Sequence, residues 1–223
     1  MLTDSLRAQL AARKQELLEF LRDEYSSRGH HRPPISPRTD GSPAPLSFSQ
    51  ERLWFLEQLE PGNAAYNICR ASCLSGSLNV AALEASLSEI VRRHETLRSQ
   101  INMVAGRPVQ VALPASKIAL PVIDLRSLTG TDRDEEVRRR SKAEAVRPFD
   151  FSVGLFLRAV LFRTGDDQHI LVLTTHHIVS DAWSMGILTR ELWAWYEAFA
   201  IARRSPFTDL SIQYRDYAIW QRE

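Results

Sequence analysis

Two adjacent histidines, His176 and His177, follow a run at 168–175 that consists mostly of Ile, Leu, Val and Thr, and Asp181 comes four residues after the second histidine. The apolar run predicts a strand in the middle of a sheet, and the end of such a strand can hold a side chain at the mouth of a cleft. An imidazole in that place could act as a general base, because histidine exchanges protons near neutral pH. Neighbouring residues on a strand point to opposite faces, so only one histidine can point into the cleft.

The residue types alone leave three roles open for the histidine pair. The two rings could serve catalysis, they could be buried polar residues of the fold, or they could bind a metal ion. A zinc site needs three or four ligands, and the nearest other histidines, His94 and His169, lack ligand spacing, so no metal site is expected. Ser180 and Ser184 do not lie in a G-x-S-x-G turn, which argues against a serine nucleophile.

Asp181 has two structural roles open to it. Its carboxylate could cap a helix beginning near Ala182, because aspartate is favoured immediately before a first helical turn. It could instead be the partner of a buried arginine, whose guanidinium forms strong hydrogen bonds with a carboxylate. Either role would hold the loop after the histidines in place.

Helices and strands alternate from about Leu46 onward, and this alternation must position the histidines. The pattern predicts an α/β (α+β) fold with a mixed central sheet and flanking helices, in which 168–175 lies in mid-sheet. Helices are predicted at 47–59, 79–93, 131–146 and 183–202, with a further element from 211. Strands are predicted at 66–74, 97–104, 107–113, 118–124, 154–163 and 168–175. The apolar side of the first helix is expected to comprise Phe48, Leu53, Phe55, Leu56 and Leu59.

The segment before Leu46 has a different composition. Leucines recur at helical spacing over residues 1–25, which predicts a helix. Its role as a linker or docking helix is only what the resemblance of the following domain to a known family implies. Residues 26–45 are rich in proline and serine and are expected to be an extended tether. The main domain is therefore expected to cover 46–223.

Composition excludes several classes of protein. The 223 residues carry 28 Lys and Arg against 27 Asp and Glu, so the net charge of +1 offers no general attraction for nucleic acid or an anionic membrane. No apolar run approaches the roughly 18 residues that span a bilayer, and the N-terminus lacks the pattern of a secretory signal. The two cysteines, Cys69 and Cys73, do not form a disulfide framework, so a cytoplasmic location is expected.

Four ordered motifs resemble those of one enzyme family. The stretch HHIVSDAWS at 176–184 is similar to the HHxxxDG signature of condensation domains in nonribosomal peptide synthetases, which have a chloramphenicol-acetyltransferase-like fold. LSFSQERLWFL at 46–56, continued by EPGNAAYN at 60–67, resembles the opening motif of that family. RHETLR at 93–98 and YRDYAIW at 214–220 resemble its second and fourth motifs.

The resemblance implies amide-bond formation between two thioester substrates, an acyl or peptidyl donor and an aminoacyl acceptor. Both are carried on phosphopantetheine arms of upstream and downstream peptidyl carrier proteins, so the arm enters as substrate and no cofactor is bound covalently. His177 maps onto the key catalytic histidine, whereas His176 and Asp181 map onto structural positions. An arginine of the second motif, Arg93 or Arg98, is expected to pair with Asp181.

The resemblance also has two departures. Ala182 stands where the family usually has glycine, and a left-handed backbone at that position would be costly for alanine. Ala182, Trp183 and Ser184 are candidates for contact with the substrate arm or, through backbone N–H groups at the helix start, with a developing oxyanion. Tyr214 and Trp220 map onto a structural motif.

The second departure is that the resemblance ends at Glu223, about halfway through a condensation domain. The chain is therefore expected to be the N-terminal lobe, inactive without a C-terminal lobe and exposing an apolar face where that lobe docks. The adenylation domain of the same synthetase would be a further partner. The alternative is a non-catalytic module that docks a carrier protein or a synthetase subunit. The residues do not specify the product, the two substrates or the L- or D-configuration of the donor.

Overall fold

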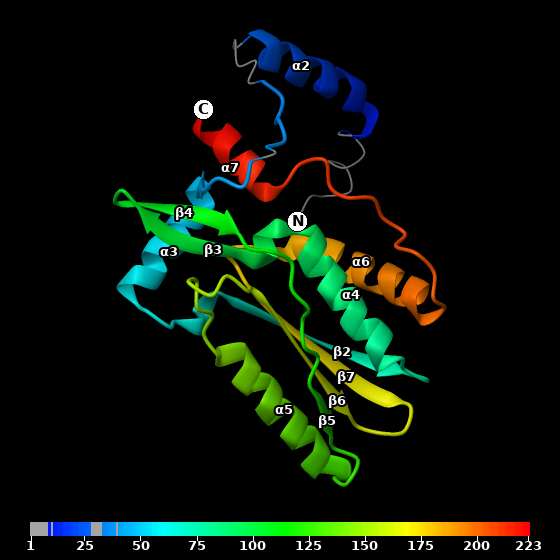
Figure 1. Ribbon diagram of the computed structural model, residues 1–223. Coiled ribbons are helices and arrows are strands. Elements are labelled where there is room, and N and C mark those ends of the chain that lie inside the picture. Colours follow the sequence, from blue (N-terminus) through cyan, green and yellow to red (C-terminus); the bar gives the residue numbers. More distant parts are fainter. Residues whose placement is uncertain (1–8, 10, 28–32, 39) are drawn as a thin grey trace. The chain divides into compact units, whose positions relative to one another are not determined.

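Residues 9, 11–27, 33–38 and 40–223 are described in the computed structural model (Figure 1), in which the chain divides into two units, 1–35 and 36–223. The described helix of the first unit is α2 (Lys14–Ser27), and Gln9 also has helical backbone. This confirms the predicted helix where the chain is described, whereas residues 1–8 and 10 lie outside the described residues. The linker or docking role of this helix stays a prediction.

The predicted tether at 26–45 is too long, because residues 36–45 belong to the second unit. The Arg215 side chain donates to the carbonyl oxygens of Arg38 and Asp40, each at 3.2 Å. Strand β1 (Ala44–Pro45) pairs antiparallel with β4 (Arg107–Ala112). Proline removes a donor but leaves its carbonyl free to accept, so a proline-rich composition did not prevent this stretch from packing.

The main sheet has four strands in the order β2 (Asn67–Ser75), β7 (Gln168–His176), β6 (Leu157–Arg163) and β5 (Val122–Asp124). Strand β7 is antiparallel to both of its neighbours, whereas β5 and β6 are parallel, so the sheet is mixed as predicted. The interior position of β7 is also confirmed. The strand that precedes the histidine pair is therefore hydrogen-bonded on both sides.

Helices cover both faces of this sheet (Figure 1), with α4 (Val80–Arg93) and α6 (Ala182–Ala200) on one face and α5 (Gly130–Val146) on the other. Leu171 and Leu173 of β7 belong to the core cluster shared with α4 and α6. Val172, between them, belongs to the cluster shared with Val137 of α5. The strand thus buries both faces in strict alternation, which fixes the side on which each later residue of β7 lies.

A smaller sheet, β1-β4-β3, lies beside α3 (Phe48–Leu59). The hairpin of β3 (Ser99–Val104) and β4 turns at Ala105 and Gly106, both with positive φ, as a two-residue turn requires. The chain also contains the 3₁₀ helices η1 (Ala64–Tyr66) and η2 (Glu95–Arg98), and α7 (Tyr214–Arg222).

Several details of the predicted elements are wrong, and the strands predicted at 97–104 and 154–163 begin only at Ser99 and Leu157. The strand predicted at 118–124 forms only from Val122, because the N–H groups of Ile118 and Leu120 donate to side chains of α4 instead of to a strand, at 3.0 Å each. On α3 the buried residues are Gln50 and Leu53, whereas Phe48, Phe55 and Leu59 are exposed. Gln50 can be buried because its side chain accepts from Ser47 N–H and from Gln110.

Gly154, just before β6, is a position where we expect alanine to be strongly destabilising. Its φ is +74°, and an added Cβ would lie 2.7 Å from the backbone nitrogen of Gln100. We expect Gly154→Ala to lower the free energy of unfolding by about 3 kcal/mol, through the left-handed backbone together with the clash. Gly106→Ala is the matched control, because its φ is +76° and nothing lies near the added methyl group. Equal losses for the two variants in urea unfolding would show that the contact with Gln100 is unimportant.

Candidate active site

The alternation of β7 continues to its last residue and separates the two histidines. Thr175 contacts Met185 of α6, its Oγ1 lying 3.6 Å from Sδ, whereas Thr174 contacts Cys69, on the face covered by α5. His176 therefore lies on the second of these faces. His177 begins the turn that follows the strand, and its backbone N–H donates to the carbonyl of Tyr66 at 2.8 Å.

His176 is buried, with 2% of its surface exposed. Its ring lies among Phe149, Phe151 and Phe156, the nearest ring centroid, that of Phe151, being 5.0 Å away. Its Nδ1 accepts the N–H of Ile178 at 3.0 Å. Burial lowers the pKa of His176 from 6.5 to about 4, with a smaller contribution from His177. A neutral His176 therefore fixes the turn that presents His177.

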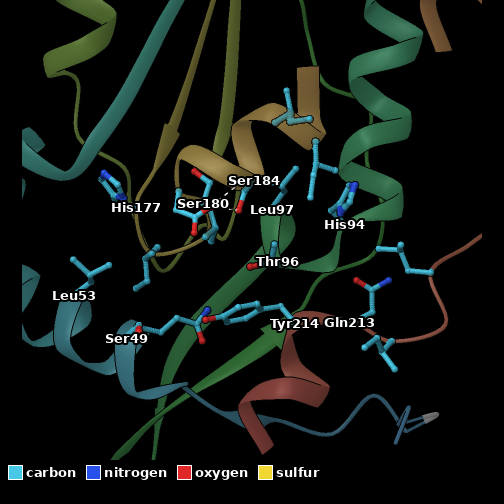
Figure 2. A pocket seen from close by; sticks show the side chains of 18 of the residues that line it. Ser49, Leu53, His94, Thr96, Leu97, His177, Ser180, Ser184, Gln213 and Tyr214 are labelled. Atoms are coloured by element: carbon cyan, nitrogen blue, oxygen red, sulfur yellow. Dashed lines mark hydrogen bonds between the residues drawn. The ribbon is translucent and has the colours of Figure 1, made fainter. Parts of the chain in front are cut away.

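His177 is exposed and lines a cavity of about 430 Å³ at the carboxyl end of β7 (Figure 2). No hydrogen bond to the His177 ring occurs within the described part of the chain. The cavity is formed by α3, η2, the turn at 177–181, the start of α6 and the segment at 210–214. Its apolar lining residues are Leu53, Leu97, Ile178, Val179, Ile187, Leu188, Leu210 and Ile212. Its polar and charged lining residues are Ser49, Gln50, Arg52, His94, Thr96, His177, Ser180, Asp181, Ser184, Gln213 and Tyr214.

Asp181 is the N-cap of α6, which confirms the first of its two predicted roles. Its Oδ1 accepts the N–H of Ser184 at 2.8 Å and the hydroxyl of Ser184 at 2.6 Å. These hydrogen bonds lower the pKa of Asp181. The carboxylate thereby joins the turn that carries His177 to the first turn of α6.

The predicted pairing of Asp181 with Arg93 or Arg98 is wrong. Arg93 Nε donates to Glu191 at 3.3 Å, and its guanidinium lies over the ring of Phe207. Arg98 donates to backbone carbonyls, including those of Val91 and Leu113. Both arginines therefore have partners other than Asp181, and the Asp181 carboxylate accepts its hydrogen bonds from Ser184. Neither arginine lines the cavity.

Ala182 and Trp183 lie outside the cavity lining, whereas Ser184 is part of it. The described non-glycine residues with positive φ are Ala105 and Ala202, so alanine at position 182 causes no strain. The first turn of α6 directs the N–H of Ser184 to Asp181, and that carboxylate would repel an oxyanion. The proposed oxyanion contact at the helix start therefore stays a prediction that this geometry disfavours.

Most residues of the cavity wall were not predicted as site residues, and three of the polar ones bear on its chemistry. They are His94, Thr96 and Gln213, and the first two belong to the same RHETLR stretch that supplied Arg93 and Arg98. Tyr214, expected to be structural, also lines the cavity, and its hydroxyl lies 3.0 Å from the Ser47 hydroxyl. Burial raises the pKa of Tyr214. The signal in the sequence for these three residues was their position within or next to a recognised motif.

Removing the Asp181 cap should weaken the turn before α6 while leaving the apolar core intact. We expect Asp181→Ala to lower the free energy of unfolding by about 1 kcal/mol, because the N–H of Ser184 loses its acceptor. Asp181→Ser, which keeps a capping oxygen, should retain most of that stability. Chemical denaturation of the two variants measures the difference. A loss of several kcal/mol in both would indicate that Asp181 pairs with a buried cation after all.

Among the described residues, no group of three or more histidine, cysteine, aspartate or glutamate side chains is arranged to hold a metal ion. The helices of the described part of the chain are also too short or too polar to cross a membrane. Both cysteines are free thiols.

Comparison with known proteins identifies relatives along most of the chain. A family model described as the condensation domain matches residues 42–223. Chondramide synthase cmdD of Chondromyces crocatus is 44% identical over 92% of this chain and 5% of its own length. Phosphinothricin tripeptide synthetase PhsC of Streptomyces viridochromogenes is 40% identical over 85% of this chain and 17% of its own length. The chain thus spans a small part of these relatives.

Solved structures share the fold. The first condensation domain of the calcium-dependent antibiotic synthetase, in complex with a substrate analogue, aligns with a TM-score of 0.69 and 27% identity. The alignment covers 76% of this chain and 40% of that one. The X-domain from teicoplanin biosynthesis aligns with a TM-score of 0.75 and 30% identity, over 84% of this chain and 40% of that one.

Proposed function

The chain belongs to the condensation-domain family of nonribosomal peptide synthetases, and from that membership we propose that it forms the His177-bearing half of an amide-forming site. The substrates are an acyl or peptidyl thioester and an aminoacyl thioester, each on the phosphopantetheine arm of a carrier protein. The synthetase supplies those carrier proteins and the adenylation domains that load them. The arms enter as substrate and need no permanent site in the chain.

The observation that carries the proposal is the position of His177. It is the exposed member of a histidine pair, at the end of an interior strand, and it lines the cavity. The Nδ1–Ile178 hydrogen bond of His176 and the Asp181 cap fix the turn around it. A side chain held in this way can remove a proton from an ammonium nucleophile, or position the amine for attack.

The reaction requires no covalent intermediate on the protein. The amine attacks the thioester carbonyl, the C–N bond forms, and the C–S bond breaks so that the thiolate leaves on the donor arm. The proton lost by the amine passes to His177 and can be returned to the thiolate. Holding both thioesters in one cavity supplies a large part of the rate by proximity.

The same alignments suggest a second lobe. The chain covers 40% of each of the two solved chains, so more than half of such a structure has no counterpart here. We infer that a further lobe closes the cavity. Exposed apolar side chains support this inference, because Leu59 is 62% and Trp183 80% exposed.

A condensation assay tests the proposal. Donor and acceptor carrier proteins, each loaded with its thioester, are mixed with the chain alone and with the chain plus a separately produced C-terminal lobe of the same synthetase. Product formed with both lobes present and absent with either lobe alone supports the proposal. A folded lobe pair that binds both carriers and makes no product contradicts it.

A non-catalytic docking module is the second candidate function. A solved relative, 31% identical and with a TM-score of 0.76, is the X-domain in a complex with OxyB from teicoplanin biosynthesis. A module of this kind needs a surface but not an exposed imidazole in a cavity. If the lobe pair retains partner binding and never forms product, docking replaces catalysis as the function.

A further inference from the structure

A second histidine lines the cavity, and the proposed reaction does not use it. His94 follows α4, and its Nε2 lies 2.6 Å from Oε2 of Glu191 on α6. Glu191 is buried, and its other oxygen accepts from Arg93 Nε at 3.3 Å. A carboxylate paired with an arginine accepts hydrogen bonds, so the His94 proton lies on Nε2. In the neutral ring Nδ1 is then a hydrogen-bond acceptor.

The structure provides no partner for this acceptor. The His94 side chain makes no capping hydrogen bond with η2, no partner of its Nδ1 occurs among the described residues, and the side chain, 22% exposed, lines the cavity. Thr96 Oγ1, in the same wall, is buried and has no hydrogen-bond partner within the described chain. Buried polar groups are nearly always satisfied. One buried hydroxyl without a partner, beside an exposed ring nitrogen that can accept, therefore points to a wall that can bind a polar ligand.

His94 and His177 lie on opposite sides of Ser180 and Ser184 in the cavity (Figure 2). The two rings therefore meet different parts of a ligand that reaches both. Resting on the proposed function, we propose that His94, oriented by Glu191, is a positioning residue whose Nδ1 accepts a hydrogen bond from an N–H or O–H group of the substrate, away from the reacting amine. That donor is either an amide of the pantetheine arm or a group on the aminoacyl side chain.

Nitrogen-15 NMR of the complete chain tests the first part of the proposal. The probes are threonyl-pantetheine and valyl-pantetheine as non-hydrolysable thioether analogues, in which the hydroxyl group of the first is replaced by a methyl group in the second. We expect His94 to be protonated on Nε2 in the free chain, and its Nδ1 resonance to move when a probe binds. A proton on Nδ1, or no movement at saturating probe, overturns the proposal. So does the failure of both probes to bind at millimolar concentration.

Two substitutions separate the two nitrogen atoms of the ring. Glutamine reaches about as far as Nε2 and can keep the hydrogen bond to Glu191, whereas asparagine reaches about as far as Nδ1 and can keep the acceptor. We expect His94→Gln to weaken probe binding about fivefold, and His94→Asn to bind within twofold of the wild type. Equal binding by the two variants, or the opposite order, overturns the proposal. An effect on both probes places the donor on the arm, and an effect on the threonyl probe alone places it on the hydroxyl.

These binding measurements are independent of catalysis. In an active lobe pair, His94→Gln should raise KM for one thioester at unchanged kcat, because the contact is made equally in the ground state and the transition state. If no mixture of lobes and carriers forms product, the proposed function fails, while the probe measurements still decide whether His94 binds ligand. If product forms and His94→Gln changes neither KM nor probe affinity, only the present inference fails.

Discussion

Replacing His177 with alanine should lower kcat for amide-bond formation by about 10²–10⁴-fold, the usual contribution of one positioned acid or base. KM for the two carrier-bound thioesters should change little, because the ring is expected to act on the proton of the amine and not on the arms. The free energy of unfolding should stay within about 0.5 kcal/mol of the wild type, because His177 is exposed. Single-turnover assays of the complete lobe pair measure the rate, and urea unfolding measures stability.

The controls for this prediction separate proton transfer from other effects. His177→Gln retains hydrogen-bonding capacity but cannot take up a proton, so it should be nearly as slow as His177→Ala if the ring is a base. Near-normal activity of His177→Gln would instead indicate that the ring only positions the amine. Gln168→Ala, exposed at the other end of β7, should be fully active. Unchanged kcat in His177→Ala would remove His177 from the mechanism.

Replacing His176 with alanine should instead destabilise the fold, by about 4 kcal/mol. The substitution removes a buried ring from its contacts with Phe149, Phe151 and Phe156, and leaves the buried N–H of Ile178 without an acceptor. His176→Phe keeps the ring volume but not the acceptor, and His176→Asn keeps an acceptor but not the volume. Each should lose less than alanine in urea unfolding. A loss under 1 kcal/mol for His176→Ala would show that the aromatic cluster does not need the ring.

His176 also predicts how stability depends on pH. Its pKa falls from 6.5 to about 4 on folding, so between these pH values the unfolded chain binds a proton that the folded chain excludes. Stability contributed at this site therefore falls as the pH is lowered from 6.5 to 4, by about 3 kcal/mol in all, and is constant above 6.5. Carboxylates titrate in part of the same range, so the wild type is compared with His176→Phe at each pH. Parallel stability curves for the two proteins would contradict the prediction.

The secondary structure and the histidine pair could largely be predicted because their signals are local. A helix was predicted at 79–93, and the structure places it at Val80–Arg93, where the Asn79 side chain accepts from Ala82 N–H. The break between the strands predicted at 97–104 and 107–113 and the interior position of β7 could equally be predicted. The buried side of α3 could not be predicted, because residue types alone favour burying phenylalanine and exposing glutamine, and α3 does the opposite at Phe48, Phe55 and Gln50.

The pairing of charges could not be predicted from spacing. Arg93, His94 and Glu191 form one cluster although α4 and α6 are far apart in the chain, and Asp181 is satisfied within its own helix turn. The second sequence motif suggested that Arg93 or Arg98 pairs with Asp181. The packing of α4 against α6 instead places Glu191 beside Arg93. The same packing brings His94 into the cavity wall, a position that the spacing of residues in the sequence could not predict.

The amino-acid sequence was enough to establish the alternation of helices and strands, the family, and the rule that only one of His176 and His177 can point into the cleft at the end of β7. The alternation and the rule for the two histidines follow from hydrogen bonding and apolar periodicity within a few residues of one another, whereas the family was identified by the resemblance of four motifs between 46 and 220. Which histidine is buried was settled by tertiary packing, because it depends on the phenylalanines at 149, 151 and 156 that pack beside the strand. Packing also settled which carboxylate meets each cation, since such pairs form between elements that lie far apart in the chain.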